Sequence, residues 1–320
     1  MVKLFTVLII TVLLSVFSLN SYAQSNYPNK TIKFIVPFAA SGPADVIART
    51  LADPLSKELK QSILIENKPG ADTLIGTRAA MQADPDGYTL LFGSSSNSVI
   101  SFLHPEHKID PTVDLIPTGL IGIAPNFIVV NPQLPINTVT ELIAYAKNNP
   151  GMLNYANTTG HIYLQIELFK SMAHINLTEI PYKGVSQAMT ALLSNEVQLT
   201  ISSVTTLAPY VNANKLRALA ITGAKRSVLF PNIPTVTEKS IPGYTGGAWY
   251  GVLAPIGTSP EVVKVLNNSI NQVLRNPDIG SDLLNKGVEI TISTPQEFSK
   301  FLSKDQDYYA KIVKEINGKK

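Results

Sequence analysis

A short apolar run followed at once by a small-residue turn and an amphipathic helix constrains the architecture of this chain most. Residues 32–38 are mostly apolar, β-branched or aromatic, which is typical of a buried parallel strand. Ser41 and Gly42 break this run, Pro43 stands where a first helical residue is favoured, and apolar residues recur at helical spacing through residues 46–59. Such a unit places unpaired backbone N–H groups at the carboxyl edge of a sheet, where anions bind.

Strand-like and helix-like segments continue to alternate after this unit. Residues 62–66 and 88–92 are predicted strands, and residues 71–81 are a predicted helix between them. This order is typical of a parallel sheet. Because parallel strands end at the same edge of a sheet, we expect the serine-rich loop at residues 94–97 to lie beside the turn at Ser41.

Two extended segments divide the chain. Residues 120–130, interrupted by Pro125, predict a crossing into a second lobe, and the glycine-containing segment 246–255 predicts the return. The alternation restarts between them, and predicted helices at residues 260–274 and 277–285 follow the return. We therefore predict a hinged α/β protein with a cleft between two lobes. The expected division is 24–123 plus 250–320 for lobe 1 and 124–249 for lobe 2 including the hinge return.

The N-terminus carries a predicted signal peptide, residues 1–23. Lys3 gives a basic start, residues 4–19 are almost uninterrupted apolar residues, and residues 21–23 form a small-x-small cleavage signal. A membrane anchor is the alternative, but the apolar run is short and polar sequence follows it at once. We expect cleavage after Ala23 and a protein secreted to the periplasm.

Composition excludes several classes of site. The 320 residues carry a formal net charge of +3 with scattered charges and contain no cysteine. There is no basic stripe of the kind that binds nucleic acid. Without cysteine, the chain has no disulfide, no thiol nucleophile and no thiolate metal site. The length favours two domains rather than a single core.

Seven segments, taken together, resemble the Bug family, the periplasmic receptors of tripartite tricarboxylate transporters. They are residues 36–49, 65–70, 84–91, 181–184, 215–220, 234–238 and 249–251, in the expected order along nearly all of the chain. The resemblance implies the type II periplasmic-binding-protein fold and capture of a small carboxylate for membrane transporter components. We expect a monomer that requires no cofactor.

Three turns depart from the family pattern. The first turn usually reads Pro-Gly-Gly, and here residues 40–42 are Ala-Ser-Gly. The turn at residues 157–163 is shorter and has Tyr163 where a histidine is usual. Residues 202–203 are Ser-Ser in place of the common Asp-Asn.

The candidate ligand contacts gather at the two predicted helix starts. Ser41 and Thr159 are each interpretable as simple helix caps, but a cap and an anion site share the same geometry. Asp45 is more typical of a structural cap, because its charge repels a carboxylate. His161 is a candidate donor, with a surface or capping role as the alternative.

The remaining candidates are the serine-rich loop, for which a solvated loop is the alternative, and two aromatic residues. Tyr182 and Trp249 are candidate cleft walls, although a buried core position is the default for either. Trp249 is preferred because it follows Gly-Gly at the predicted hinge. The full set is Phe38, Ala40, Ser41, Gly42, Ala44, Asp45, Ser94, Ser95, Asn97, Asn157, Thr158, Thr159, Gly160, His161, Tyr182, Ser202 and Trp249.

Catalytic patterns are absent from the sequence. It contains no Gly-x-Ser-x-Gly, Ser-x-x-Lys or His-Glu-x-x-His, so a periplasmic hydrolase is the weaker alternative. His104 and His107 have a weak metal-ligand spacing, and we interpret them as part of a solvated loop rather than a metal site. A sensory receptor that presents its ligand to a membrane kinase uses the same fold and remains an alternative.

The expected ligand is a carboxylate without an ammonium group, such as a di- or tricarboxylate or an aromatic acid. An ammonium group needs an anionic partner when it leaves water, and the loops at residues 94–97 and 157–160 carry no acid. His161 is the expected side-chain cation nearby.

The first testable prediction concerns processing. Because the cleavage signal ends at Ala23, the mature protein in the periplasmic fraction should begin at Gln24. N-terminal sequencing of that fraction checks this. Retention of Met1 on a protein found in the membrane pellet contradicts it.

Overall fold

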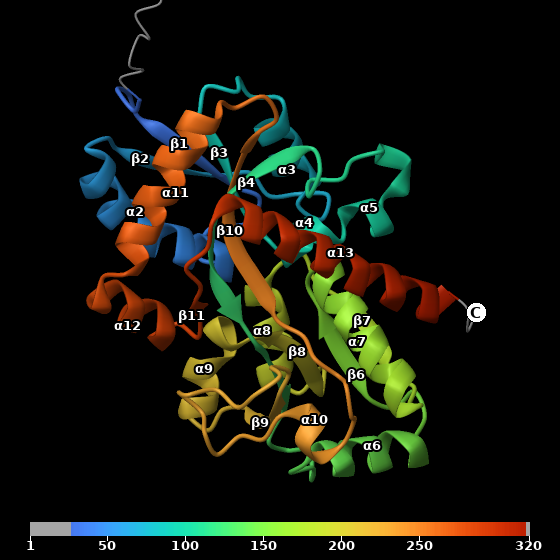
Figure 1. Ribbon diagram of the computed structural model, residues 1–320. Helices are drawn as coiled ribbons and strands as arrows, with labels where there is room; N and C mark the ends of the chain where they lie inside the picture. The colour runs from blue at the N-terminus through green and yellow to red at the C-terminus, as the bar shows by residue number, and fades with distance from the viewer. Residues whose placement is uncertain (1–26, 318–320) are drawn as a thin grey trace, which may run out of the picture.

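The computed structural model describes residues 27–317, which form two α/β lobes (Figure 1). Each lobe is built on one β-sheet with apolar cores on both of its faces. The predicted signal peptide, residues 1–23, and its cleavage site lie outside the described residues. Within residues 27–317, no helix combines the length and the apolar character needed to cross a membrane.

The sheet of lobe 1 is mixed. Its strand order is β11-β4-β10-β3-β1-β2. β1 runs parallel to β2 and β3, whereas β10 runs antiparallel to β3 and β4. The alternation of segments predicted a parallel sheet. Parallel pairing is found only among β1, β2 and β3, because β10 enters from the other lobe and runs antiparallel to both of its neighbours. The strands are β1 (Ile32–Val36), β2 (Ile63–Asn67), β3 (Thr89–Ser94), β4 (Leu115–Ala124), β10 (Ala248–Pro255) and β11 (Glu289–Ile290).

Helices cover both faces of this sheet. The predicted helices α11 and α12 match the sequence analysis at both ends, because Ser259 and Asn276 cap them and a proline begins each. The serine-rich segment predicted as a loop is instead helical (α4), with Ser94 as its cap. The helices are α2 (Pro43–Leu59), α3 (Leu74–Met81), α4 (Ser95–Ser98), α5 (Ile100–Leu103), the 3-10 turn η1 (Pro105–His107), α11 (Pro260–Leu274), α12 (Pro277–Asn285) and α13 (Pro295–Asn317).

Lobe 2 has a second mixed sheet in the order β7-β6-β8-β5-β9. β6 runs parallel to β7 and β8, and β5 runs antiparallel to β8 and β9. Its strands are β5 (Asn126–Val130), β6 (Asn154–Asn157), β7 (Thr178–Pro181), β8 (Leu199–Ser203) and β9 (Arg217–Ile221). Its helices are α6 (Val139–Asn148), α7 (Gly160–Ala173), α8 (Val185–Leu193), α9 (Val204–Asn212) and α10 (Val236–Lys239).

Two segments connect the lobes, as predicted, and hydrogen bonds of Thr222 hold them side by side. The first connection runs from β4 through Pro125 into β5, and the second leads from β9 to β10. The N–H of Thr222 donates to the carbonyl of Asn126 at 2.8 Å, and its hydroxyl accepts from the Asn126 N–H at 2.9 Å. The same hydroxyl donates to the carbonyl of Gly246 at 2.9 Å.

Helix α13 lies across both lobes (Figure 1). Phe298 and Leu302 in its first half belong to an apolar core of lobe 1. Tyr309 and Ile312 in its second half belong to the core that α6 and α7 form in lobe 2. The predicted division of the chain, which gives all of residues 250–320 to lobe 1, remains a prediction, but α13 contributes to both cores.

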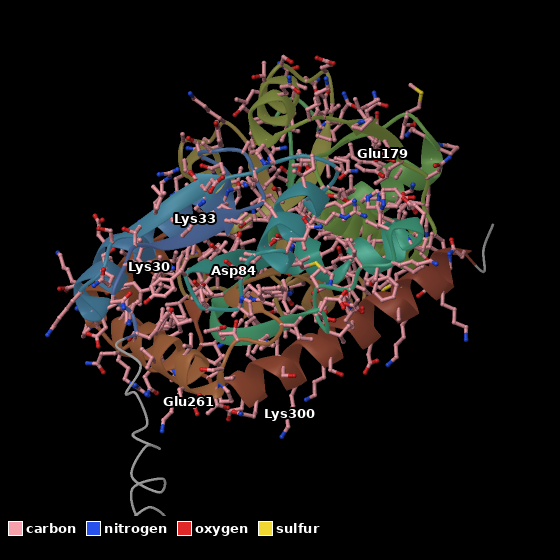
Figure 2. The ribbon with its side chains drawn as sticks, turned by 90° about the horizontal axis from the view of Figure 1, so that it is seen from above. Lys30, Lys33, Asp84, Glu179, Glu261 and Lys300 are labelled. Carbon is pink, nitrogen blue, oxygen red and sulfur yellow. The ribbon has the colours of Figure 1, made fainter. Side chains whose placement is uncertain are left out.

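Charges of both signs are interspersed over the surface. Figure 2 shows Lys30 and Lys33 on the N-terminal part of the chain and Glu179 on the other lobe. Lys30 lies 3.1 Å from the Asp86 carboxylate, and Lys33 lies 2.8 Å from that of Glu66. Exposed pairs of this kind contribute little to stability.

Asp305 on α13 fixes the indole of Trp249. The Trp249 N–H donates to the Asp305 carboxylate at 3.0 Å and to the Ser98 hydroxyl at 3.2 Å, and its ring packs edge-on against Phe298. Burial raises the pKa of Asp305 to about 6, although hydrogen bonds with Ser98 and Trp249 act in the opposite direction.

The second prediction concerns this buried acid. The folded protein holds the Asp305 proton up to about pH 6, whereas the unfolded chain releases it near pH 3.8. Stability should therefore fall as pH rises through this window. The variant Asp305→Asn should lose that part of the pH dependence and gain about 3 kcal/mol above pH 7 relative to wild type. Urea denaturation from pH 4 to 8 measures it, and an identical pH profile for both proteins contradicts it.

Candidate functional site

A cavity of about 1110 Å³ lies between the two lobes. Lobe 1 lines it with residues 37–44 and 69–73, and lobe 2 lines it with residues 157–163, 179 and 181–187. Asn126, Ala248 and Tyr250 lie beside the hinge and also line it. The turn at Ser41 and the segment beginning at Ser94 share this cavity, as expected for strands that end at one sheet edge.

The start of α2 carries two unpaired backbone donors, and one of the two residues, Ala44, lines the cavity. The N–H of Ser41 donates to the Asp45 carboxylate at 2.8 Å, and the N–H of Gly42 donates to the carbonyl of Ala39 at 3.2 Å. These two N–H groups, which sequence analysis assigned to the ligand, are therefore used within the turn. Among the described residues, the N–H groups of Ala44 and Asp45 have no hydrogen-bond partner.

The Asp45 side chain is structural and does not line the cavity. It is 2 % exposed and accepts hydrogen bonds from Arg49 at 2.9 Å and from Asn67 at 2.9 Å, besides that from Ser41. Burial acts to raise its pKa, but these hydrogen bonds outweigh burial and hold the pKa below its usual value. Its position at the first turn of α2 agrees with the capping interpretation.

The start of α7 is met by a carboxylate from the opposite lobe. The N–H of Gly160 donates to both oxygens of Asp72, at 3.0 and 3.2 Å. Thr159 caps the same helix by accepting from the N–H of Ile162 at 3.4 Å. The inference that no acid faces the cleft is therefore wrong, because Asp72 and Glu179 both line it.

The position of Asp72 follows from an irregular turn. Residues 71–81 were predicted as a helix, but α3 begins only at Leu74. Ala71, Asp72 and Thr73 instead have φ angles of 46, 50 and 76°, a left-handed conformation that is costly outside glycine. The sequence offered one indication that Asp72 lies in the cleft, namely its position. The turn that contains it follows β2 and so lies at the same sheet edge as the turn at Ser41.

His161 lines the cavity as a neutral side chain. It is 3 % exposed, its Nε2 donates to the carbonyl of Gly247 at 3.0 Å, and its ring packs edge-on against Tyr309. Burial lowers its pKa to about 4. The expectation that His161 supplies a cation is therefore wrong, because a desolvated imidazole sheds its proton.

The aromatic wall differs from the one predicted. Tyr182 and Tyr250 line the cavity, whereas Trp249 lies in the core of lobe 1. The reason is strand alternation, since neighbouring residues of β10 point to opposite faces. Burial raises the pKa of Tyr250 to about 12, so its hydroxyl stays protonated.

The serine-rich segment is divided between the cavity and the protein interior. Ser94 and Ser96 line the cavity, whereas Ser95 and Asn97 do not. The Ser95 hydroxyl accepts from the backbone N–H of Trp249 at 2.9 Å, and the Asn97 side-chain amide donates to the Thr77 hydroxyl at 2.8 Å. These two side chains therefore position α4, and the alternative of a solvated loop is wrong because all four side chains are buried.

Most of the predicted residues lie in the cavity wall. They are Phe38, Ala40, Ser41, Gly42, Ala44, Ser94, Asn157, Thr158, Thr159, Gly160, His161, Tyr182 and Ser202. Sequence reasoning about the ligand site missed Asp72, Thr73, Ser96, Asn126, Tyr163, Glu179, Lys183 and Tyr250. Asn126 had one usable signal, since it directly follows Pro125 at the predicted crossing.

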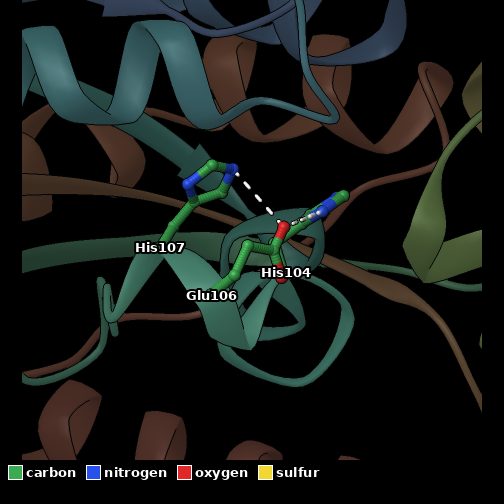
Figure 3. A group of neighbouring side chains, drawn as sticks. All are labelled: His104, Glu106 and His107. Atoms are coloured by element: carbon green, nitrogen blue, oxygen red, sulfur yellow. Dashed lines mark ion pairs between the residues drawn. The ribbon is translucent and has the colours of Figure 1, made fainter.

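His104, Glu106 and His107 form a small cluster at the edge of the cleft (Figure 3). Glu106 Oε1 lies 3.6 Å from His104 Nδ1 and 3.5 Å from His107 Nε2. Arg78 lies 3.4 Å from His107 Nδ1. Arginine only donates hydrogen bonds, so this contact makes His107 Nδ1 an acceptor and leaves the ring proton on Nε2. Nε2 is the nitrogen that faces Glu106, so a metal ion bound between these two residues would have to displace that proton. The expectation of no metal site stays a prediction.

Comparison with known proteins places the chain in a family. Residues 47–318 match the family described as the tripartite tricarboxylate transporter family receptor. The chain belongs to this family. The receptor is 34% identical to Protein BugT of Bordetella pertussis over 301 residues, which cover 93% of this chain and 92% of BugT.

Solved structures share the fold of this receptor. The R. palustris protein Rpa4515 with adipate has a TM-score of 0.85 and 31% identity, covering 91% of this chain and 98% of the other. MatC of Rhodopseudomonas palustris with bound malate has a TM-score of 0.84 and 27% identity, and the match covers 90% of this chain and 100% of MatC. These matches confirm the predicted periplasmic-binding-protein fold and the resemblance to the Bug receptors.

The third prediction concerns His161. The unfolded chain takes up a proton near pH 6.5 at this residue, whereas the folded protein does so only near pH 4. Stability should therefore be lost as pH falls through this window, by about 3 kcal/mol in all. In His161→Gln, whose amide can still donate to the Gly247 carbonyl, the loss should be smaller by that amount. Urea midpoints between pH 7 and 4 test this, and parallel curves for the two proteins contradict it.

Proposed function

We propose that this receptor captures a small carboxylate in the interlobe cleft and delivers it to a tripartite membrane transporter. In this proposal the chain is exported, is cut after Ala23 and acts in the periplasm. Membership of the transporter receptor family supports this role. Two relatives of the same fold, one with adipate and one with malate, support a carboxylate as the ligand class.

The start of α2 is the observation that carries the proposal. The unpaired N–H groups of Ala44 and Asp45 lie at the positive end of a helix of 17 residues, and Ala44 lines the cavity together with Ser41. Anions bind at such helix ends because the N–H groups and the helix dipole both favour negative charge. Arg49 offsets the buried charge of Asp45, so that this acid interferes less with a bound carboxylate.

The rest of the cleft suits binding and exclusion of water. Tyr182 and Tyr250 give it aromatic walls, and Ser94, Ser96 and Ser202 supply hydroxyl groups. Within the described part of the chain, neither cleft histidine is hydrogen-bonded to a hydroxyl group that it would activate as a nucleophile. The proposal is therefore stoichiometric binding without chemical turnover.

The fourth prediction tests the carboxylate site at α2. A Cβ on Gly42 has one neighbour within 4 Å, the Ala39 carbonyl oxygen at 3.2 Å, and the φ of −74° suits any residue. This contact with a backbone oxygen is tighter than an ordinary one, so the variant Gly42→Leu should melt slightly below wild type, while its side chain blocks the start of α2. Calorimetric titration with short-chain carboxylates should show saturable heat and unchanged ligand for wild type, and at least about tenfold weaker binding for the variant.

A matched control keeps this test specific. Gly280→Leu introduces the same side chain on α12, where a Cβ meets only Ile290 at an ordinary distance of 3.7 Å. This variant should bind as wild type does. If Gly42→Leu melts normally and binds the carboxylate as tightly as Gly280→Leu, the assignment to α2 is wrong. Steady consumption of the ligand at a rate proportional to protein overturns the binding role itself.

A further inference from the structure

We infer that Asp72 selects among carboxylate ligands by requiring a cationic hydrogen-bond donor, best an ammonium group, at the α7 end of the cleft. The inference rests on the proposed function and deepens it. It places the ligand carboxylate at α2 and the donor group at Asp72. A ligand with carboxylates at both ends is then disfavoured.

Asp72 already fills the anion site that α7 offers. Its two oxygens accept from the Gly160 N–H at 3.0 and 3.2 Å, across the cleft from lobe 1 to lobe 2. A Cβ at position 160 would overlap the tips of the Asp72 and Leu103 side chains, so both side chains would have to move. The two helix starts are therefore unequal, since α2 is open to a ligand anion and α7 is closed by a protein anion.

The charge of Asp72 opposes a second ligand carboxylate. Like charges a few ångströms apart in a site that excludes water repel strongly. Glu179 lines the same cavity and adds to the negative potential, with its carboxylate 2.8 Å from the Asn157 amide. Two basic side chains also line the cavity. His104 Nε2 lies 3.8 Å from Asp72 Oδ2, an ion pair only when His104 is protonated and too long for a hydrogen bond. Lys183 is an exposed residue of the other lobe.

Asp72 retains the capacity to bind a donor. A carboxylate accepts about four hydrogen bonds, and one N–H is the donor that the described residues supply to it. Its side chain is 20% exposed toward this cavity. The oxygens are therefore open to an ammonium group, which needs such a partner once it leaves water.

Two further buried groups in the cavity wall lack partners. Asn126 is fully buried, and its Oδ1 forms no hydrogen bond within residues 27–317. Thr73 is 4% exposed, and its hydroxyl is likewise unpaired in that part of the chain. Buried polar atoms without partners are rare and costly. Both residues line the cleft and point to a polar ligand group that satisfies them.

Matched ligand pairs separate the two ends of the ligand. The pairs are succinate with γ-aminobutyrate, glutarate with δ-aminovalerate, and adipate with ε-aminocaproate. In each pair the amino acid has an aminomethyl group in place of one carboxylate of the diacid. Calorimetric titration of the full-length mature protein with all six compounds gives the affinity ratio within each pair. For the chain length that binds best, wild type should bind the amino acid about tenfold or more tightly than the diacid.

The variant Asp72→Asn tests the residue itself. Asparagine tolerates a left-handed φ and can still accept from the Gly160 N–H, so the contact between the lobes persists while the charge is lost. The variant should bind the diacid about tenfold more tightly and the amino acid about tenfold less tightly than wild type. Asp53→Asn removes an exposed acid from α2 far along the helix and should leave both affinities unchanged.

The outcomes distinguish this inference from the proposed function. Tighter binding of the diacid by wild type, or the same affinity ratio in wild type and Asp72→Asn, overturns the role of Asp72 and leaves carboxylate capture intact. Absence of saturable heat for all six compounds with both proteins overturns the proposed function together with the inference.

Discussion

A helix cannot satisfy the N–H groups of its own first turn, and the cleft of this receptor is organised by that constraint. Two long helices, α2 and α7, begin at the facing edges of two sheets. Their first N–H groups need partners from elsewhere. At α2 the N–H groups of Ala44 and Asp45 remain open, whereas at α7 the Gly160 N–H receives a carboxylate from the opposite lobe. The two ends of the cleft therefore present opposite electrostatic requirements to a ligand.

The connections between the lobes decide how this cleft can open. Thr222 bonds both crossing segments together, so these segments move as one unit. Helix α13 packs on the cores of both lobes through Phe298 and Tyr309. Opening the cleft must therefore change the packing of α13 on at least one lobe. The contact between Asp72 and Gly160 also joins the two lobes, so separating these two segments must break it.

Burial keeps the hinge side of the cleft uncharged. The pKa of His161 is lowered by burial, so its ring is neutral at physiological pH. The hydroxyl of Tyr250 stays protonated for the same reason. A wall of neutral, desolvated groups strengthens the electrostatic interactions that remain in the cavity.

The sequence by itself determined the elements and the two crossings, because periodicity and caps are local signals. Pro43 and Thr159 mark true helix starts, and most of the residues predicted at those turns line the cleft. The tertiary structure alone decided which side chains face it. Trp249 lies in the core because of the strand pairing of β10, and Asp72 reaches α7 from a residue far away in the sequence. Trp249 depends on which face of the lobe 1 sheet it occupies once β10 has paired with β3 and β4, and Asp72 depends on how the two lobes pack against each other.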